Sequence, residues 1–226
     1  MPRPRSKARS SPKTPASAHA ATARGRGNAR EARSAARREA ILTAALEEFS
    51  ERGFAATRLD DVAKRAGIAK GTIYLYFRDK ESLFQELIRS TLTPLVGTIE
   101  ALGKADIPVA MLAERIVQLF VHEIFGTKRK DVVRLMISEG RRFPKLAEFY
   151  YREVLSHIMT AVRALMTRAA ARGEVPEALA RFPQLIAAPG VVAIIWNGLF
   201  DRFAPLDVEA LMRAHVDLLF GPGRAP

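Results

Sequence analysis

Apolar residues recur at intervals of three and four along most of this chain, which is the spacing of one face of an α-helix. The pattern begins at Arg33, and residues 1–32 contain no Leu, Ile, Val or Phe. It predicts a first helix that stops near Gly53, because glycine commonly ends helices. The apolar face of this helix is formed by Ile41, Leu42, Ala45, Leu46 and Phe49.

Two short segments follow. The first has one apolar face, and Thr57 followed by Asp60 predicts a variant of the capping box at its start. Gly67 predicts a tight corner after it, because glycine adopts a positive φ without steric cost. The second short segment covers residues 70–77, and a fourth helix begins at Asp79. The apolar face of the first short segment is formed by Leu59, Val62, Ala63 and Ala66.

Prolines and glycines then divide the rest of the chain, with Pro94 and Pro108 as the first breaks. Further helices are predicted near residues 108–125, 130–140, 145–172, 184–203 and 206–220. No strand-like alternation of useful length occurs. We therefore expect an all-α protein of about nine helices. It would have a disordered basic tail (1–32), an N-terminal three-helix DNA-binding domain (33–84), and a C-terminal helical domain for dimerisation and ligand binding (85–226).

Two short helices joined by a tight corner are typical of the helix-turn-helix motif. Ile68, Ile73 and Phe77 are expected to pack on the first helix. The remaining positions then face outward with donors and apolar groups that suit a DNA groove. Lys80 lies at a helix N-terminus, where a phosphate is favoured. The outward or flanking positions are Lys70, Gly71, Thr72, Tyr74, Leu75 and Tyr76.

The net charge is +12, and residues 1–38 carry +10 of it because they hold eleven Lys and Arg against Glu31 alone. A basic arm of this kind is attracted to any polyanion. The alternative function is therefore non-specific nucleic-acid binding driven by the tail. Deleting residues 1–32 separates the two, because a specific regulator keeps its site selectivity and loses mainly affinity.

Several classes of protein are disfavoured. The absence of cysteine excludes disulfides and thiolate sites. The most apolar stretch, 185–200, is too short to span a bilayer and is interrupted by Pro189, Gly190 and Asn197. No paired catalytic groups or phosphate-binding loop stand out, and the histidines are far apart. We expect a cytoplasmic protein that is not an enzyme and has no metal or cofactor and no membrane partner.

An ordered set of residues in this region resembles the DNA-binding domain of the TetR/AcrR family of regulators. The set is Gly53-Phe54, Thr57, Asp61-Val62-Ala63, Ala66-Gly67-Ile68, Lys70-Gly71-Thr72-Ile73-Tyr74, Tyr76-Phe77, Lys80-Glu81 and Leu83. The resemblance covers about residues 36–84. It implies that Lys70, Thr72, Tyr74 and Leu75 face bases or the adjacent backbone. It also implies that Thr57, Tyr76 and Lys80 hold phosphates. Ala69 departs from the family, which often has a capping serine there.

The resemblance further implies dimerisation through the last two long helices and a ligand pocket in the C-terminal body. The apolar residues in those helices surround much of the circumference, which by itself calls for a partner. The expected dimer face is Val192, Ile195, Leu199, Leu211 and Leu218. Candidates for the pocket, each of which also fits ordinary core packing, are Met111, Phe120, Phe125, Met136, Phe149, Tyr150, Met159 and Trp196.

The function that these features favour is a homodimeric repressor that reads a palindromic operator in double-stranded DNA. An unknown small-molecule effector bound in the C-terminal domain would release it.

Overall fold

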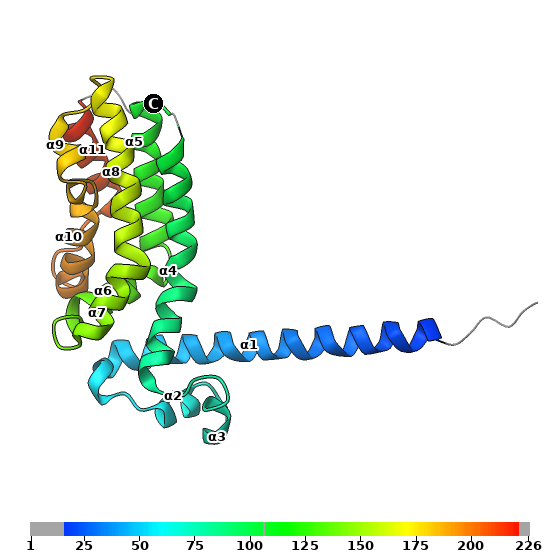
Figure 1. The fold of residues 1–226 in the computed structure, drawn as a ribbon. Coiled ribbons are helices and arrows are strands. Elements are labelled where there is room, and N and C mark those ends of the chain that lie inside the picture. The colour runs from blue at the N-terminus through cyan, green and yellow to red at the C-terminus, as the bar shows by residue number, and fades with distance from the viewer. Residues whose placement is uncertain (1–15, 106, 222–226) are drawn as a thin grey trace, which may run out of the picture. The chain divides into compact units, whose positions relative to one another are not determined.

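The computed structural model describes residues 16–105 and 107–221, and within these ranges every regular element is helical (Figure 1). The chain divides after Ala40 into two compact units. Two stretches of wider, π-helical turns, η1 and η2, continue helices α5 and α7. The elements are α1 (Ala16–Ala56), α2 (Leu59–Arg65), α3 (Lys70–Ile73), α4 (Lys80–Lys104), α5 (Val109–Gln118), η1 (Leu119–Phe125), α6 (Arg129–Glu139), α7 (Pro144–Tyr150), η2 (Tyr151–Leu155), α8 (Ser156–Ala171), α9 (Glu177–Arg181), α10 (Gln184–Phe200) and α11 (Val208–Phe220).

The all-α prediction is confirmed. Helix α5 continues into η1, and α7, η2 and α8 form one continuous helix, so the described residues contain ten continuous helices, one more than the nine expected. The addition is α9, a helix of five residues between α8 and α10. It is too short to show a helical period in the sequence, and its N-cap is Pro176. None of the described helices is long and apolar enough to cross a membrane.

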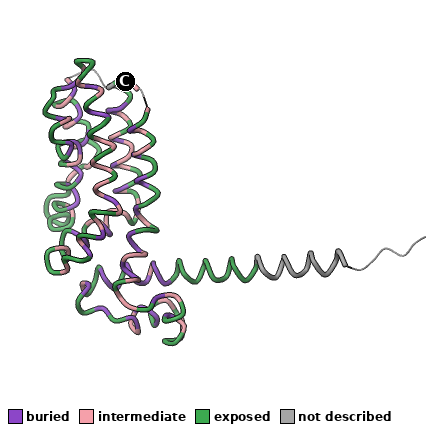
Figure 2. Tube along the Cα trace, viewed as in Figure 1, coloured by how far each residue is buried: buried purple, intermediate pink, exposed green. Residues whose placement is uncertain are grey.

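Helix α1 begins at Ala16, seventeen residues before the predicted start. The helix thus extends over residues 16–32 of the tail that the sequence predicts to be disordered, and residues 1–15 lie outside the described part. Alanine and arginine, both strong helix formers, dominate this stretch, so helix propensity replaces the missing apolar face. Residues 29–40 are exposed throughout (Figure 2).

Helix α4 runs through Pro94 to Lys104, so the predicted break at this proline is wrong. A proline inside a helix removes one backbone hydrogen bond, and the exposed position of Pro94 leaves the freed carbonyl near solvent. The predicted domain boundary between residues 84 and 85 also falls inside this helix. As a result, α4 begins beside the helix-turn-helix and ends in the C-terminal bundle.

Two clusters of buried apolar side chains stabilise residues 41–221. The first joins α1, α2, α3 and the first half of α4 to α6 and α7, and rings from three of these segments meet in it. The second lies between α4, α5, α8 and the last helices. Gly103 allows α4 to approach α8 closely, because an added Cβ there would lie 3.1 Å from the Ala161 carbonyl oxygen.

Candidate nucleic-acid interface and ligand cavity

The corner between α2 and α3 is closed by backbone hydrogen bonds. Gly67 has a φ of 66°, as its position in the sequence predicts. Its amide donates to the Lys64 carbonyl, and the Ile68 amide donates to the Ala63 carbonyl. This pair of bonds is the Schellman arrangement, which satisfies the last carbonyls of a helix and turns the chain. It fixes the direction in which α3 leaves α2.

The third segment has one buried side and one exposed side. Ile73 and Phe77 are buried in the first core cluster, and Ile68 packs against it, as predicted. Helix α3 itself ends at Ile73, and the next three residues continue as hydrogen-bonded turns. Leu75 is 83% exposed and Tyr74 is 49% exposed. Such large apolar groups in open solvent are unusual for a surface that has no partner.

Asp60 on α2 organises the exposed donors of this surface. Its carboxylate lies 2.6 Å from the Lys70 ammonium and 3.5 Å from the Tyr74 hydroxyl. The hydrogen bond to Asp60 raises the pKa of Lys70. Lys70 and Tyr74 are therefore held side by side, although they lie on one element and Asp60 on another. We did not foresee this residue from the sequence, because only the crossing of α2 and α3 brings the three together.

Gly71 is exposed and Thr72 half-buried on the same short segment. Tyr76 is half-buried and its ring packs against the first core cluster. The geometry thus groups five of the eight predicted contact residues on an outward surface: Lys70, Gly71, Thr72, Tyr74 and Leu75.

Thr57 is buried, and the prediction that it caps α2 is wrong. The hydroxyl donates to carbonyl oxygens of α1, 2.9 Å from Gly53 and 3.1 Å from Glu48. The N-cap of α2 is instead Arg58, which makes no side-chain cap. The threonine ties the chain back onto α1 after Gly53, where φ is 74°.

Lys80 extends toward the C-terminal end of α1 instead of standing free at the start of α4. Its ammonium donates to the Ala55 carbonyl at 2.9 Å and lies 4.7 Å from the centre of the Phe54 ring. Partial burial lowers the pKa of this ammonium. The start of α4 is capped by Asp79 and Ser82, which exchange hydrogen bonds in a capping box. The backbone hydrogen bond from Ser82 lowers the pKa of Asp79.

Ala69 is the N-cap of α3 and provides no side-chain hydrogen bond. We expect Ala69→Ser to raise the free energy of unfolding by about 0.5–2 kcal/mol, because serine can accept a bond from an amide in the first turn. Urea unfolding followed by circular dichroism measures this. Ala214→Ser, at an exposed position inside α11, is the control and should give no gain. Equal stability of the Ala69→Ser variant and the wild type would contradict the prediction.

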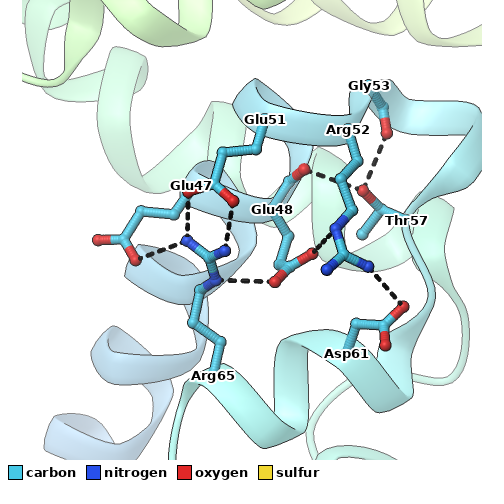
Figure 3. A network of polar contacts seen from close by, with 8 residues as sticks. All are labelled: Glu47, Glu48, Glu51, Arg52, Gly53, Thr57, Asp61 and Arg65. Carbon is cyan, nitrogen blue, oxygen red and sulfur yellow. Dashed lines mark hydrogen bonds and ion pairs between the residues drawn. The ribbon is translucent and has the colours of Figure 1, made fainter.

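A network of ion pairs joins α1 to α2 beneath the helix-turn-helix (Figure 3). At its centre is Glu48, whose side chain is 4% exposed. Arg65 Nε donates to Glu48 Oε1 at 2.7 Å, and the same guanidinium also reaches Glu51. The second oxygen of Glu48 accepts no hydrogen bond and lies 3.3 Å from Arg52 Nε. The carboxylates raise the pKa of Arg65, with the hydrogen bond that Arg65 donates to Glu51 as the largest cause.

An apolar cavity of about 150 Å³ lies within the C-terminal bundle. Its walls come from α4, α5 with η1, the start of α6, the end of α7, α8 with η2, and α10. Both π-helical stretches contribute to the wall, and such turns are frequent at functional sites. Gly190 on α10 faces Phe120 of η1 so closely that an added Cβ would lie 2.0 Å from a ring carbon.

Of the eight predicted pocket residues, Phe120, Tyr150 and Met159 line this cavity. The other five predictions are wrong for it. Met136 and Phe149 are buried in the first core cluster, and Phe125 packs against the second. Met111 is 50% exposed, and Trp196 is exposed, with its indole N–H donating to the Ala204 carbonyl.

Three lining side chains of the cavity are polar, and none of the lining residues is a carboxylate. Arg129 donates through Nε to the Thr91 carbonyl and pairs through Nη1 with Glu123, 2.5 Å away. Arg115 lies on α5, and burial raises the pKa of Tyr150 to about 12. Neither arginine was predicted from the sequence as a lining residue. A charged residue within an otherwise apolar helix face is a signal that could have indicated them.

The predicted dimer face is largely open in the single chain. Leu218 is 84% exposed, Leu199 64%, Val192 51% and Ile195 41%, whereas Leu211 is half-buried. These residues lie on α10 and α11, which pack against each other. Exposed apolar area of this extent is typical of an interaction surface.

Two family models match the chain. Residues 41–87 match the family described as bacterial regulatory proteins, tetR family, and residues 113–219 match the tetracyclin repressor-like C-terminal domain. These matches cover the helix-turn-helix and most of the cavity wall.

Several characterised regulators and solved structures are similar to this chain. The transcriptional repressor BepR of Brucella suis is 32% identical over 151 residues, covering 63% of this chain and 70% of BepR. The transcriptional regulator RutR of Escherichia coli is 29% identical over 121 residues, and the match spans 54% of this chain but only about half (49%) of RutR. A solved complex of SmeT with triclosan is 20% identical, with a TM-score of 0.67, and covers 84% of this chain and 95% of that one. SmeT is the repressor of a multidrug efflux pump of Stenotrophomonas maltophilia.

Proposed function

This chain belongs to the TetR family of bacterial regulatory proteins, and we propose that it is a homodimeric repressor that releases its operator when a small molecule fills the cavity. The observation that carries the DNA-binding part is the exposed side of the third segment. There Lys70 and Tyr74 present donors and Leu75 presents an apolar group, on a segment anchored from behind by Ile73 and Phe77. Donors of this kind reach phosphates and base acceptors, and an apolar group can contact the thymine methyl.

Lys70 would exchange Asp60 for DNA on binding. Its ammonium is already paired and ordered, so it enters the interface with less conformational entropy to lose. Lys80 would contribute a phosphate contact after leaving the Ala55 carbonyl. A contact with phosphate carries no sequence information, whereas a contact with a base edge does.

We expect Tyr74→Ala to lower the affinity for the specific operator at least tenfold and to change the affinity for unrelated DNA little, because a lost base contact costs about 1–3 kcal/mol. Electrophoretic mobility shift at fixed salt measures both. Tyr151→Ala, at a tyrosine that is 61% exposed on η2, is the matched control. Operator binding by Tyr74→Ala at the wild-type affinity would overturn the placement of this surface on DNA.

The dimer follows from the open apolar face of α10 and α11. Pairing two copies there would bury Leu218, Leu199 and Val192 and would present two recognition segments to one duplex. The two-fold symmetry of this dimer makes the operator a palindrome, with half-sites one helical turn, about 34–36 Å, apart.

The proposal that a small-molecule effector releases the DNA is supported by the cavity and by the course of α4. This helix starts at the helix-turn-helix, and its later turns line the cavity through Leu92, Leu95 and Ile99. A ligand that separates the cavity walls would therefore also move the element that supports α3. SmeT, with the same fold, has been solved with triclosan bound, which agrees with a small organic effector.

The basic α1 extension favours a supporting contact with DNA. Residues 1–38 carry +10, and such charge attracts the phosphate backbone without reading sequence. It therefore adds affinity to the regulator and does not replace the specific surface.

A further inference from the structure

The cavity has a marked imbalance between its apolar wall and its few polar groups. Those groups are two guanidiniums and one phenol, with no carboxylate among the lining residues. An apolar wall takes an apolar body of the ligand. The two guanidiniums, with no carboxylate beside them in the lining, discriminate among the possible polar groups of that ligand. A cationic group would meet like charge, whereas an anionic group would meet opposite charge.

Tyr150 is the one uncharged polar side chain among the lining residues. Burial is the cause that raises the pKa of its hydroxyl to about 12, and the hydroxyl has no hydrogen-bond partner among the described residues. A buried hydroxyl without a partner is costly, and a ligand atom that accepts its hydrogen bond would remove that cost. Tyr150 is thus a donor that the protein itself leaves unused.

Arg129 and Arg115 supply the charge. The guanidinium of Arg129 is held by the Thr91 carbonyl and by Glu123, but Nη2 has no acceptor within the described ranges. Arg115 forms no ion pair with any described residue. Glu123 neutralises only one of the two positive charges, so the polar part of the wall remains net positive.

We propose that the effector of this protein is an anionic amphiphile, with an apolar body against the apolar lining of the cavity and a carboxylate-like group that accepts a hydrogen bond from Tyr150 and is attracted by the positive charge of Arg129 and Arg115. This inference rests on the proposed function, since it assigns the chemical class of the molecule that fills the same cavity. It gives Tyr150 the role of a ligand donor, whereas a purely structural role would need only its ring.

The test compares three probes with one apolar body and different polar groups: decanoate, decanamide and decylammonium. Isothermal titration of the full-length, DNA-free protein at pH 7.5 gives the dissociation constant of each. We expect decanoate to bind at least tenfold more tightly than the other two, because hydrogen bonds to charged groups contribute the most.

Two conservative variants locate the preference. Tyr150→Phe keeps the ring and should weaken decanoate about tenfold while leaving decylammonium nearly unchanged. Arg115→Gln, at a more exposed position, should weaken decanoate by roughly fivefold or less. Tyr151→Phe and Arg163→Gln replace exposed residues outside the cavity wall and should leave all three affinities unchanged.

Equal affinity for the three probes, failure of all three to bind, or an equal loss for all of them in Tyr150→Phe would overturn the proposal. A mobility shift with operator DNA, run on the same preparations, tests the proposed function separately. If the protein binds its operator but shows no preference for decanoate, only the proposed ligand class is overturned. If the protein prefers decanoate but binds no operator, the proposed function as a DNA-binding repressor is overturned instead.

Discussion

Gly190→Ala is expected to destabilise the protein by about 1–3 kcal/mol and to abolish most ligand binding, because the new methyl group would lie 2.0 Å from the Phe120 ring. The ring forms part of the cavity wall and can yield only by moving into the cavity or by pushing α10 away. The first movement fills the space that the effector needs, and the second opens the second core cluster. Urea unfolding and titration with decanoate measure the two effects.

Gly97→Ala is the matched control for this change. Gly97 is also inside a helix, but an added Cβ there meets no atom within 4 Å. Its replacement should stabilise the protein by about 0.5–1 kcal/mol, since alanine loses less backbone entropy on folding. The double variant Gly190→Ala, Phe120→Leu removes the ring that clashes and should recover part of the lost affinity. Unchanged stability and affinity in Gly190→Ala would show that the approach of α10 to η1 is looser than described.

Arg65→Met is expected to lower the unfolding temperature by several degrees and to weaken operator binding strongly. It leaves the buried carboxylate of Glu48 without its main partner, and a buried charge that loses its partner destabilises the folded state. Arg52 still lies 3.3 Å from the second oxygen and the Arg65 side chain is 27% exposed, so both features reduce the effect. Differential scanning calorimetry and a mobility shift assay measure the two results.

Removing one partner of a buried ion pair is costly, whereas replacing both partners is not, and this difference provides the check on the Arg65→Met prediction. Replacing both partners, Glu48→Leu with Arg65→Met, should recover most of the stability, because no charge is then left in the interior. Arg152→Met is the surface control, since its ion pair with Glu153 is exposed and contributes little. A double variant less stable than Arg65→Met alone would mean that the network acts through its charges and not through the burial of Glu48.

Local rules of the sequence decided much of the helix-turn-helix. The positive φ of Gly67, the inward Ile73 and Phe77, and the missing side-chain cap at Ala69 all follow from neighbouring residues. The predictions were wrong where a residue distant in the sequence offered a better interaction than the neighbouring residues did. Thr57 fits a cap by spacing, but the carbonyls of α1 lie closer to its hydroxyl.

The cavity shows the opposite balance. Helical spacing shows which residues face inward, but not whether the space before them is filled. Met136 and Phe149 therefore looked as suitable as Phe120, although they belong to the solid core.

The sequence by itself thus determined the helical class, the buried and exposed sides of the third segment, and the position of the charge, because these depend on residues within a few turns of each other. Only the tertiary structure decided that Asp60 holds Lys70 and Tyr74, that Glu48 is buried between two arginines, and that Tyr150 faces a cavity. These features depend on how distant helices cross, and the free energy that sets a crossing is summed over contacts that no local pattern contains.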